Sequence, residues 1–274
     1  MRLPPYLAEW LNLLARWFHV FAGILWVGST FYFTWLDGRF QEEEREARAA
    51  GGGGEPAVWM VHSGGFYEVG KRKVPALNRL HWFRWEAALT WLSGMVLLTV
   101  VYYHGGAMVD RDVRDMGEWT AGAFGVGFII AGWVAYDLLV RSPLARSARA
   151  FAVASYALIV GACYLSTHVL SGRAAFIHVG AALGTIMVAN VWMRILPAQR
   201  RMIAAVREGR APDPAEGASA KLRSKHNTFM AVPVVFTMVS NHYPVSTYGH
   251  EYNWLVLSAL VLVGWVAAKI VRRA

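Results

Sequence analysis

Long apolar runs recur along the chain and constrain its fold more than any other feature. A helix needs about 20 apolar residues to cross a bilayer. Seven runs approach or exceed that length, near residues 8–35, 82–103, 119–140, 150–168, 174–193, 226–241 and 252–271. Only 16% of the residues are charged, whereas soluble domains carry about 25%. The sequence therefore predicts an all-α fold, a polytopic membrane helical bundle of about seven transmembrane helices.

The connections between these runs differ sharply in basic charge. Of the 27 Lys and Arg residues, 22 lie in connections and a tail that share one side of the predicted bundle. Because basic residues favour the cytoplasmic side, the N-terminus is expected outside and the C-terminus in the cytoplasm. Residues 1–274 are expected to form a single transmembrane domain with two long cytoplasmic loops, at about 36–80 and 194–225.

Each long loop has a recognisable composition. The first contains the charged run 41–48 and then four glycines at 51–54, which together predict a flexible linker. The second begins at Pro197 with alternating basic and apolar residues, a pattern typical of an interfacial amphipathic helix.

Charge and cysteine content exclude several classes of protein. The net charge of +9 would suit nucleic acid, but 13 tryptophans and the apolar runs favour a basic membrane face. We therefore expect the lipid bilayer, and no nucleic acid, as a partner. Cys163 is the single cysteine, which excludes an internal disulfide, a Cys-rich metal site and a covalent haem motif in this sequence.

Two histidines lie within predicted spans, where ionisable residues are costly and usually functional. His19 shares a helix stripe with polar and small residues, and His178 shares one with alanines and a threonine. Two imidazoles at similar depth on different helices can ligate one haem iron axially. The alternative reading is that each histidine merely bonds a neighbouring helix.

A second set of polar residues lies at the predicted inner edge of the membrane. His81 and His226 flank the starts of two spans, and Glu86 begins a polar stripe through residues 90, 93 and 94. Glu86 would serve as a proton-relay group or as half of a plain ion pair. The segment 62–68 combines glycines with aromatics, which suits contact with a planar ligand or an interfacial aromatic belt.

Motifs along the chain, in order, resemble those of the bacterial membrane-bound urate oxidase (urate hydroxylase) family. They include Arg16-Trp-Phe-His-Val-Phe-Ala-Gly23, His62-Ser-Gly-Gly-Phe-Tyr-Glu-Val69, Leu80-His-Trp-Phe-Arg-Trp-Glu86, His178-Val-Gly-Ala181, His226-Asn-Thr228 and Ser240-Asn-His-Tyr-Pro244. The resemblance covers essentially the whole chain. The first motif alone is also similar to copper-resistance and haem-synthesis proteins.

The resemblance implies a membrane-bound oxidoreductase of purine catabolism in the bacterial inner membrane. Such a protein converts urate to 5-hydroxyisourate and passes electrons through b-type haem to cytochrome c. Typical members add an eighth span and a C-terminal cytochrome c domain, which this sequence lacks. A separate cytochrome c or another respiratory acceptor is therefore expected as a partner.

The resemblance also implies site residues. Urate is planar and anionic, so its pocket needs hydrogen-bond donors and an aromatic wall. Acid–base chemistry is expected from His62, His81, Glu86 and His226. The residues expected to bind urate are Phe66, Tyr67, Arg84, Lys225, Asn227 and Thr228. One haem b, or two, would use His19 and His178 as axial ligands, with His81, His226 and His242 as alternatives.

Three other functions stay open from the sequence. A haem-b electron-transfer subunit, serving a partner dehydrogenase or the quinone pool, would hold haem without oxidising urate. A transport or copper-handling protein would bind metal without haem, although the ten scattered methionines form no ligand cluster. A haem-synthesis oxidase would account for the first motif only.

Overall fold

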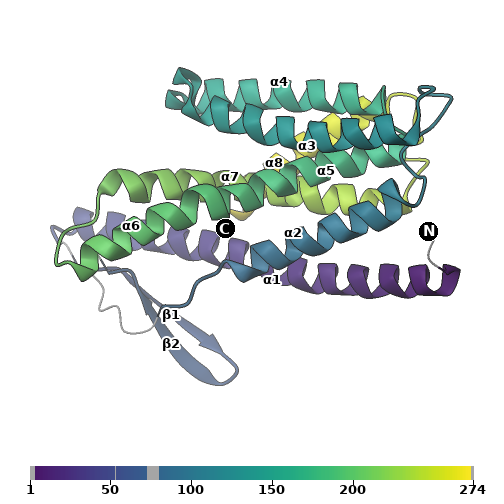
Figure 1. Ribbon diagram of the computed structural model, residues 1–274. Helices are drawn as coiled ribbons and strands as arrows, with labels where there is room; N and C mark the ends of the chain where they lie inside the picture. The colour runs from purple at the N-terminus through teal and green to yellow at the C-terminus, as the bar shows by residue number, and fades with distance from the viewer. Residues whose placement is uncertain (1–3, 53, 73–79, 273–274) are drawn as a thin grey trace.

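The computed structural model describes residues 4–52, 54–72 and 80–272, and these form an almost entirely helical bundle (Figure 1). The long helices are α1 (Pro5–Ala49), α2 (Trp85–Leu98), α3 (Glu118–Arg141), α4 (Ala148–Thr167), α5 (Gly172–Ala189), α6 (Leu196–Arg207), α7 (Pro214–Val239) and α8 (Asn253–Val271). Short π-helical segments, η1 (Thr99–Tyr103) and η3 (Asn190–Ile195), continue α2 and α5. Two 3₁₀ turns, η2 (Pro143–Arg146) and η4 (Ser240–His242), and a hairpin of β1 (Ala57–His62) and β2 (Gly65–Gly70) complete the described fold.

Six helical segments within the described residues are long and apolar enough to cross a membrane. They correspond to six of the seven predicted spans. The predicted span 226–241 also lies in a helix, α7, but that helix starts earlier, at Pro214, and carries many polar residues. α7 is therefore outside the set that length and composition alone would place in a membrane.

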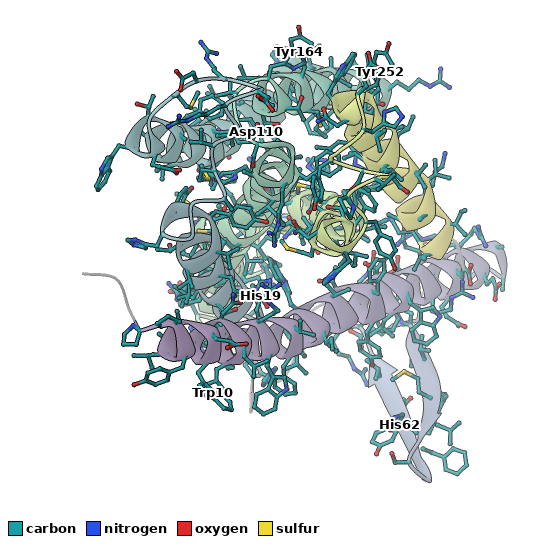
Figure 2. The ribbon with its side chains drawn as sticks, turned by 90° about the vertical axis from the view of Figure 1, so that its right-hand side faces the viewer. Trp10, His19, His62, Asp110, Tyr164 and Tyr252 are labelled. Carbon is teal, nitrogen blue, oxygen red and sulfur yellow. The ribbon has the colours of Figure 1, made fainter. Side chains whose placement is uncertain are left out.

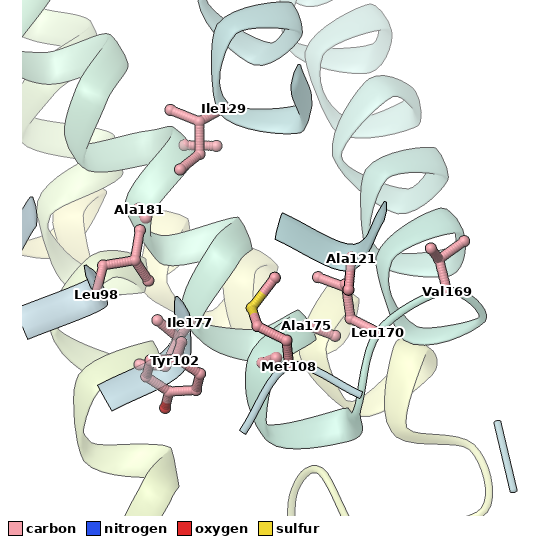
Figure 3. Close-up of a cluster of buried hydrophobic side chains, with 12 residues drawn as sticks. Leu98, Tyr102, Met108, Ala121, Ile129, Val169, Leu170, Ala175, Ile177 and Ala181 are labelled. Carbon is pink, nitrogen blue, oxygen red and sulfur yellow. The ribbon is translucent and has the colours of Figure 1, made fainter. Parts of the chain in front are cut away.

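α5 is the central helix of the bundle. In the most apolar window of the segment Gly172–Arg207, which begins with α5, 89% of the residues are buried. In the corresponding window of α1, 11% of the residues are buried. Small residues allow this burial, because they let neighbouring helices approach closely. Figure 3 shows Ala175, Ile177 and Ala181 of α5 packed among side chains of the surrounding elements, including Leu98 and Ala121.

The contact between α5 and α7 gives a first prediction. A Cβ atom added to Gly180 would lie 2.0 Å from Oγ1 and 2.9 Å from Cβ of Thr237 on α7. We expect Gly180→Ala to destabilise the protein by about 1–3 kcal/mol, the usual cost of overpacking a core. Thermal unfolding in detergent would measure the loss. Gly161→Ala is the matched control, because a Cβ on Gly161 of α4 meets no other atom within 4 Å.

The prediction of a long loop at 36–80 is wrong for most of the described residues in this range, and residues 73–79 lie outside the described part of the chain. Residues 41–48 continue α1 as far as Ala49 instead of forming a flexible linker. The reason is local, since Ala, Glu and Arg are strong helix formers and the run contains helix-spaced ion pairs such as Arg48–Glu44 and Arg39–Glu42. Residues 57–70 form the antiparallel hairpin, closed by Ser63 and Gly64, which both have positive φ.

The expected loop at 194–225 is also mostly helical. α5, η3 and α6 run without a break from Gly172 to Arg207, and α7 begins at Pro214. The amphipathic segment from Pro197 is a helix as predicted, and Pro197 lies directly after the π-helical segment η3. α6 packs against α7, and Arg201 of α6 forms an ion pair with Glu216 of α7.

α7 remains helical through Pro233. The proline ring is accommodated by Gly264 of α8, where an added Cβ would lie 2.8 Å from the proline Cδ. The predicted interruption of this span is thus absorbed by close packing of α7 on α8.

Candidate functional site

A buried carboxylate with three arginine partners joins α3, η3 and α7. Asp137 receives hydrogen bonds from Arg194 on both oxygens, at 3.0 and 2.6 Å, and from Arg223 at 2.8 Å. Arg141, one turn further along α3, lies 2.8 Å from the same carboxylate. We call these four residues the Asp137 cluster. Its arginines outnumber its single acid, so the cluster carries surplus positive charge.

An amide network extends the Asp137 cluster toward His226. Asn190 of η3 donates to Tyr136 Oη at 3.0 Å and to Asn227 Oδ1 at 2.9 Å, and it accepts from Arg223 at 3.2 Å. Tyr136 Oη in turn lies 2.9 Å from His226 Nδ1. These five side chains come from three elements, and their hydrogen bonds fasten the elements together.

The positions of these residues follow from helical spacing. Arg223, His226 and Asn227 lie three or four residues apart on α7 and therefore share one face. The imidazole of His226 stacks on Phe151 of α4, with centroids 4.6 Å apart and planes 10° apart. Thr228 is buried and bonds Thr34 of α1 at 3.1 Å. The predicted residues His226, Asn227 and Thr228 thus lie in the bundle, and Lys225 is exposed.

Unpaired polar atoms gather around Trp85 at the start of α2. Arg84 Nε, Glu86 Oε2 and Trp192 Nε1 are buried and have no hydrogen-bond partner within the described residues. The guanidinium of Arg84 lies over the Trp85 ring, 5.4 Å from its centroid, and Trp192 of η3 meets Trp85 edge to face at 5.9 Å. We call Arg84, Glu86 and Trp192 the Glu86 cluster. Leaving such groups unpaired is costly, so each is available to hydrogen-bond a ligand or an ordered water.

The Glu86 cluster combines complementary groups at the start of α2 and on the neighbouring η3. Arg84 and Trp192 present N–H donors, Glu86 presents an acceptor, and the tryptophans provide aromatic faces. A groove of about 330 Å³ lies between Trp82 and α6, with Arg200, Arg207 and Glu208 in its lining, and Arg84 lies 5.9 Å from the centroid of the Trp82 ring. This combination suits a planar, anionic ligand with both N–H and C=O groups.

The polar stripe predicted on α2 connects Glu86 with His19. His19 Nδ1 lies 2.9 Å from the carbonyl oxygen of Thr90 and 3.0 Å from Ser93 Oγ. Gly94 completes the contact, because a Cβ there would lie 3.0 Å from Cε1 of the His19 ring. Figure 2 shows His19 on the side of α1 that faces the bundle, whereas Trp10 points away from it.

His178 lies fully buried on α5. Its Nδ1–H donates to the carbonyl oxygen of Ala174 at 2.7 Å, and its Nε2 lies 3.1 Å from the hydroxyl of Tyr103. Gly125 of α3 lies against the same nitrogen, since a Cβ there would be 2.6 Å from Nε2. His178 therefore has a neighbour on each side, as the simpler interpretation of the sequence expected, and its Nε2 is directed at a hydroxyl and a glycine.

The remaining predicted residues lie elsewhere. His62, Phe66 and Tyr67 are exposed on the hairpin, where His62 Nδ1 bonds Ser63 at 2.9 Å. His81 is largely exposed, with Nε2 3.8 Å from Glu86. His81 thus lies near Glu86, whereas His226 contacts Tyr136 and Phe151 instead.

His242 is exposed in η4, at the end of α7. Among the described residues no three His, Cys, Asp or Glu side chains are grouped as a metal site. Haem ligation would therefore rest on isolated histidines.

Several residues of these clusters are not evident from the sequence. Asp137 reads there as an interfacial residue, although an acid within an apolar run is itself a signal of function. Tyr136, Asn190 and Trp192 have no such signal. Asn190 and Trp192 become significant because η3 is π-helical, a geometry that is frequent at functional sites.

Six helical segments are long and apolar enough to cross a membrane, which is compatible with a multi-pass α-helical membrane protein, and buried polar clusters lie on either side of η3. The sequence model of the urate oxidase N-terminal family matches residues 5–273, and the chain therefore belongs to that family. Membership indicates a urate-related function and, at a general level, oxidoreductase activity. No curated protein and no solved structure matches the chain.

Proposed function

We propose that this protein is a membrane-bound urate oxidase that converts urate to 5-hydroxyisourate. The observation that carries the proposal is the Glu86 cluster, with its three unpaired polar atoms beside aromatic rings. Family membership supplies the substrate class. The proposed orientation places the charged end of α1, near Ala49, in the cytoplasm of a bacterial inner membrane.

Recognition of urate follows from the chemistry of the Glu86 cluster. The N–H groups of Arg84 and Trp192 would donate to urate oxygens, and the Arg84 charge would balance the urate anion. Glu86 Oε2 would accept a hydrogen bond from a ring N–H. The three unpaired atoms are themselves buried, and burial strengthens a hydrogen bond to each of them.

The proposed reaction is a two-electron oxidation that adds one oxygen atom, derived from water, to urate. Urate and one water give 5-hydroxyisourate, two protons and two electrons, so the enzyme needs a base and an electron acceptor. Glu86 would take a proton, and His81, 3.8 Å away, would pass it toward solvent. The electrons would pass to a one-electron respiratory acceptor such as a separate cytochrome c.

The contacts of His19 and His178 support them as the residues that would hold a haem b. Both have Nδ1 bonded to a backbone carbonyl, the arrangement that fixes the ring and leaves Nε2 as the ligating atom. Gly94 and Gly125 pack against the two rings and Tyr103 lies 3.1 Å from His178 Nε2, so haem bound at His178 would have to displace these contacts. When bound, haem would supply one-electron transfer. The Glu86–Ser93 stripe spans about 10 Å of α2, so the His19 end lies within a short distance of the Glu86 cluster.

Spectroscopy of the purified protein tests this proposal. We expect a b-type haem spectrum, reduced when urate is added without oxygen and accompanied by release of 5-hydroxyisourate. His178→Ala is expected to lose most of the haem. If dithionite reduced the haem and urate did not, the result would contradict the urate oxidase and favour an electron-transfer subunit. Protein without haem but with urate oxidation by an artificial acceptor would contradict the haem assignment alone.

A further inference from the structure

The β1–β2 hairpin presents an unusually apolar outer face. Trp59, Val61 and Phe66 are 67%, 69% and 81% exposed, and Val61 and Phe66 are cross-strand partners. Because side chains alternate between the two faces of a hairpin, these three residues lie on the same face, together with the exposed Glu68, the cross-strand partner of Trp59. Single exposed apolar residues are common on protein surfaces, whereas three large ones on one face indicate a surface that contacts a protein or a membrane.

The other face of the hairpin is partly covered by α1, although Tyr67 on this face is 51% exposed. Val58, Met60 and Val69 lie on that face and are partly buried. Met60 Sδ is 3.6 Å from the hydroxyl of Tyr32 on α1, and Lys71 at the end of the hairpin pairs with Glu44 of α1 at 2.9 Å. These contacts hold the hairpin against α1, so the outer face has a defined position.

That position is at the end of the lipid-exposed surface of α1. The exposed large apolar side chains of this helix run from Tyr6 to Phe33, and charged residues follow from Asp37 onward. Tyr32, which contacts the hairpin, therefore lies at the boundary between the apolar and the charged part. Phe83, which precedes α2, meets Phe33 edge to face at 4.8 Å and marks the same level on the neighbouring element.

The hairpin extends sideways from this boundary. Figure 2 shows it standing away from the helical bundle beside α1, with His62 near its tip. In Figure 1 the hairpin runs from the charged end of α1 back along the helix. Trp59 and Val61 flank Met60 in the strand, so their side chains lie within a few ångströms of the Tyr32 level.

We propose that Trp59, Val61 and Phe66 rest in the headgroup region of the adjacent lipid leaflet, so that the hairpin is an interfacial anchor. The outer face is continuous with Tyr32 and Phe33, which are exposed on a membrane-spanning helix, and this continuity points to lipid as the occupant. Trp and Phe side chains at such a boundary match the aromatic belts of membrane proteins. The inference is independent of the substrate and of haem.

Spin labelling of the whole chain tests the anchor. A single cysteine is introduced as Val61→Cys or Phe66→Cys, and the parent chain serves as the background because Cys163 is buried. The labelled protein is reconstituted into bilayers of phosphatidylethanolamine and phosphatidylglycerol. Accessibility of each label to oxygen, which concentrates in lipid, is compared with accessibility to a water-soluble nickel chelate. Glu43→Cys is the aqueous control, and Val126→Cys on the exposed face of α3 is the lipid control.

Labels at 61 and 66 are expected to favour oxygen over nickel, with values between those of the two controls. Nickel accessibility equal to that of the Glu43→Cys label would overturn the proposal, because the face would then be in water. Low accessibility to both reagents would also overturn it, because another protein surface, such as a second copy of the chain, would then cover the face.

Discussion

Replacing Glu86 by glutamine is expected to lower kcat for urate oxidation by about 10²–10⁴-fold, the usual contribution of a general base. The amide keeps the size of the side chain and can still accept a hydrogen bond, but it cannot take a proton at neutral pH. Because recognition is largely preserved, KM should change much less than kcat. Steady-state kinetics of purified protein with an artificial electron acceptor would measure both constants.

Two variants sharpen this test. Glu43→Gln changes an exposed acid on the charged end of α1 and should leave both constants unchanged. Trp192→Phe removes one N–H while keeping an aromatic ring, and it should raise KM by about 2–10-fold, the value of one hydrogen bond. A Glu86→Gln protein with wild-type kcat would remove the base assignment. A Trp192→Phe protein with wild-type KM would contradict the binding of urate by Trp192 of η3.

Asp137→Asn is expected to destabilise the protein by about 3–5 kcal/mol, the typical cost of removing one partner from a buried ion pair. The change leaves Arg194 and Arg223 without their carboxylate, and the Arg223 side chain is only 6% exposed. Thermal unfolding in detergent, followed by circular dichroism, would report the loss. Asp115→Asn is the matched control because Asp115 lies in an exposed loop.

A second substitution separates the ion pair from a general packing effect. Arg223→Gln in the Asp137→Asn background removes one of the stranded charges, so the double variant should be less destabilised than the sum of the two single variants. Strict additivity would show that Asp137 and Arg223 act independently. That result would contradict the coupling of the two charges within the Asp137 cluster.

The sequence predicts the helices well because their signal is local. Apolar runs of the right length identify six helical segments that the structure also places among the candidate spans. The stripe from Glu86 to Gly94 is another local prediction that the structure brings into contact with one partner, His19. Periodicity of 3.6 residues is enough to say that such side chains share a face.

Partners across the bundle are beyond the reach of periodicity. Asp137 bonds Arg194 and Arg223, which are 57 and 86 positions away in the chain. Helical periodicity predicts which face of α3 carries Asp137. Which helix contacts that face is determined only by tertiary packing. The same holds for Trp192, whose ring reaches Trp85 only because η3 packs beside the start of α2.

The errors at 36–80 and 194–225 have a related cause. Both segments are charged and contain glycine or proline, so their composition resembles that of loops. In the structure, helix propensity and ion pairs keep residues 41–48 in α1, and packing on α7 orders α6. Charge therefore marked where the apolar spans stop, but not where the helices end.

The sequence by itself determined that this chain is an apolar helical bundle, and its motifs resembled a family to which it does belong. These properties depend on composition and on short-range order, which the linear chain carries. Tertiary structure alone decided which polar groups meet, that three of them near the start of α2 have no partner within the described residues, and that the hairpin lies at the end of the exposed apolar surface of α1. Those features arise from helix packing, which brings together side chains that no sequence spacing relates.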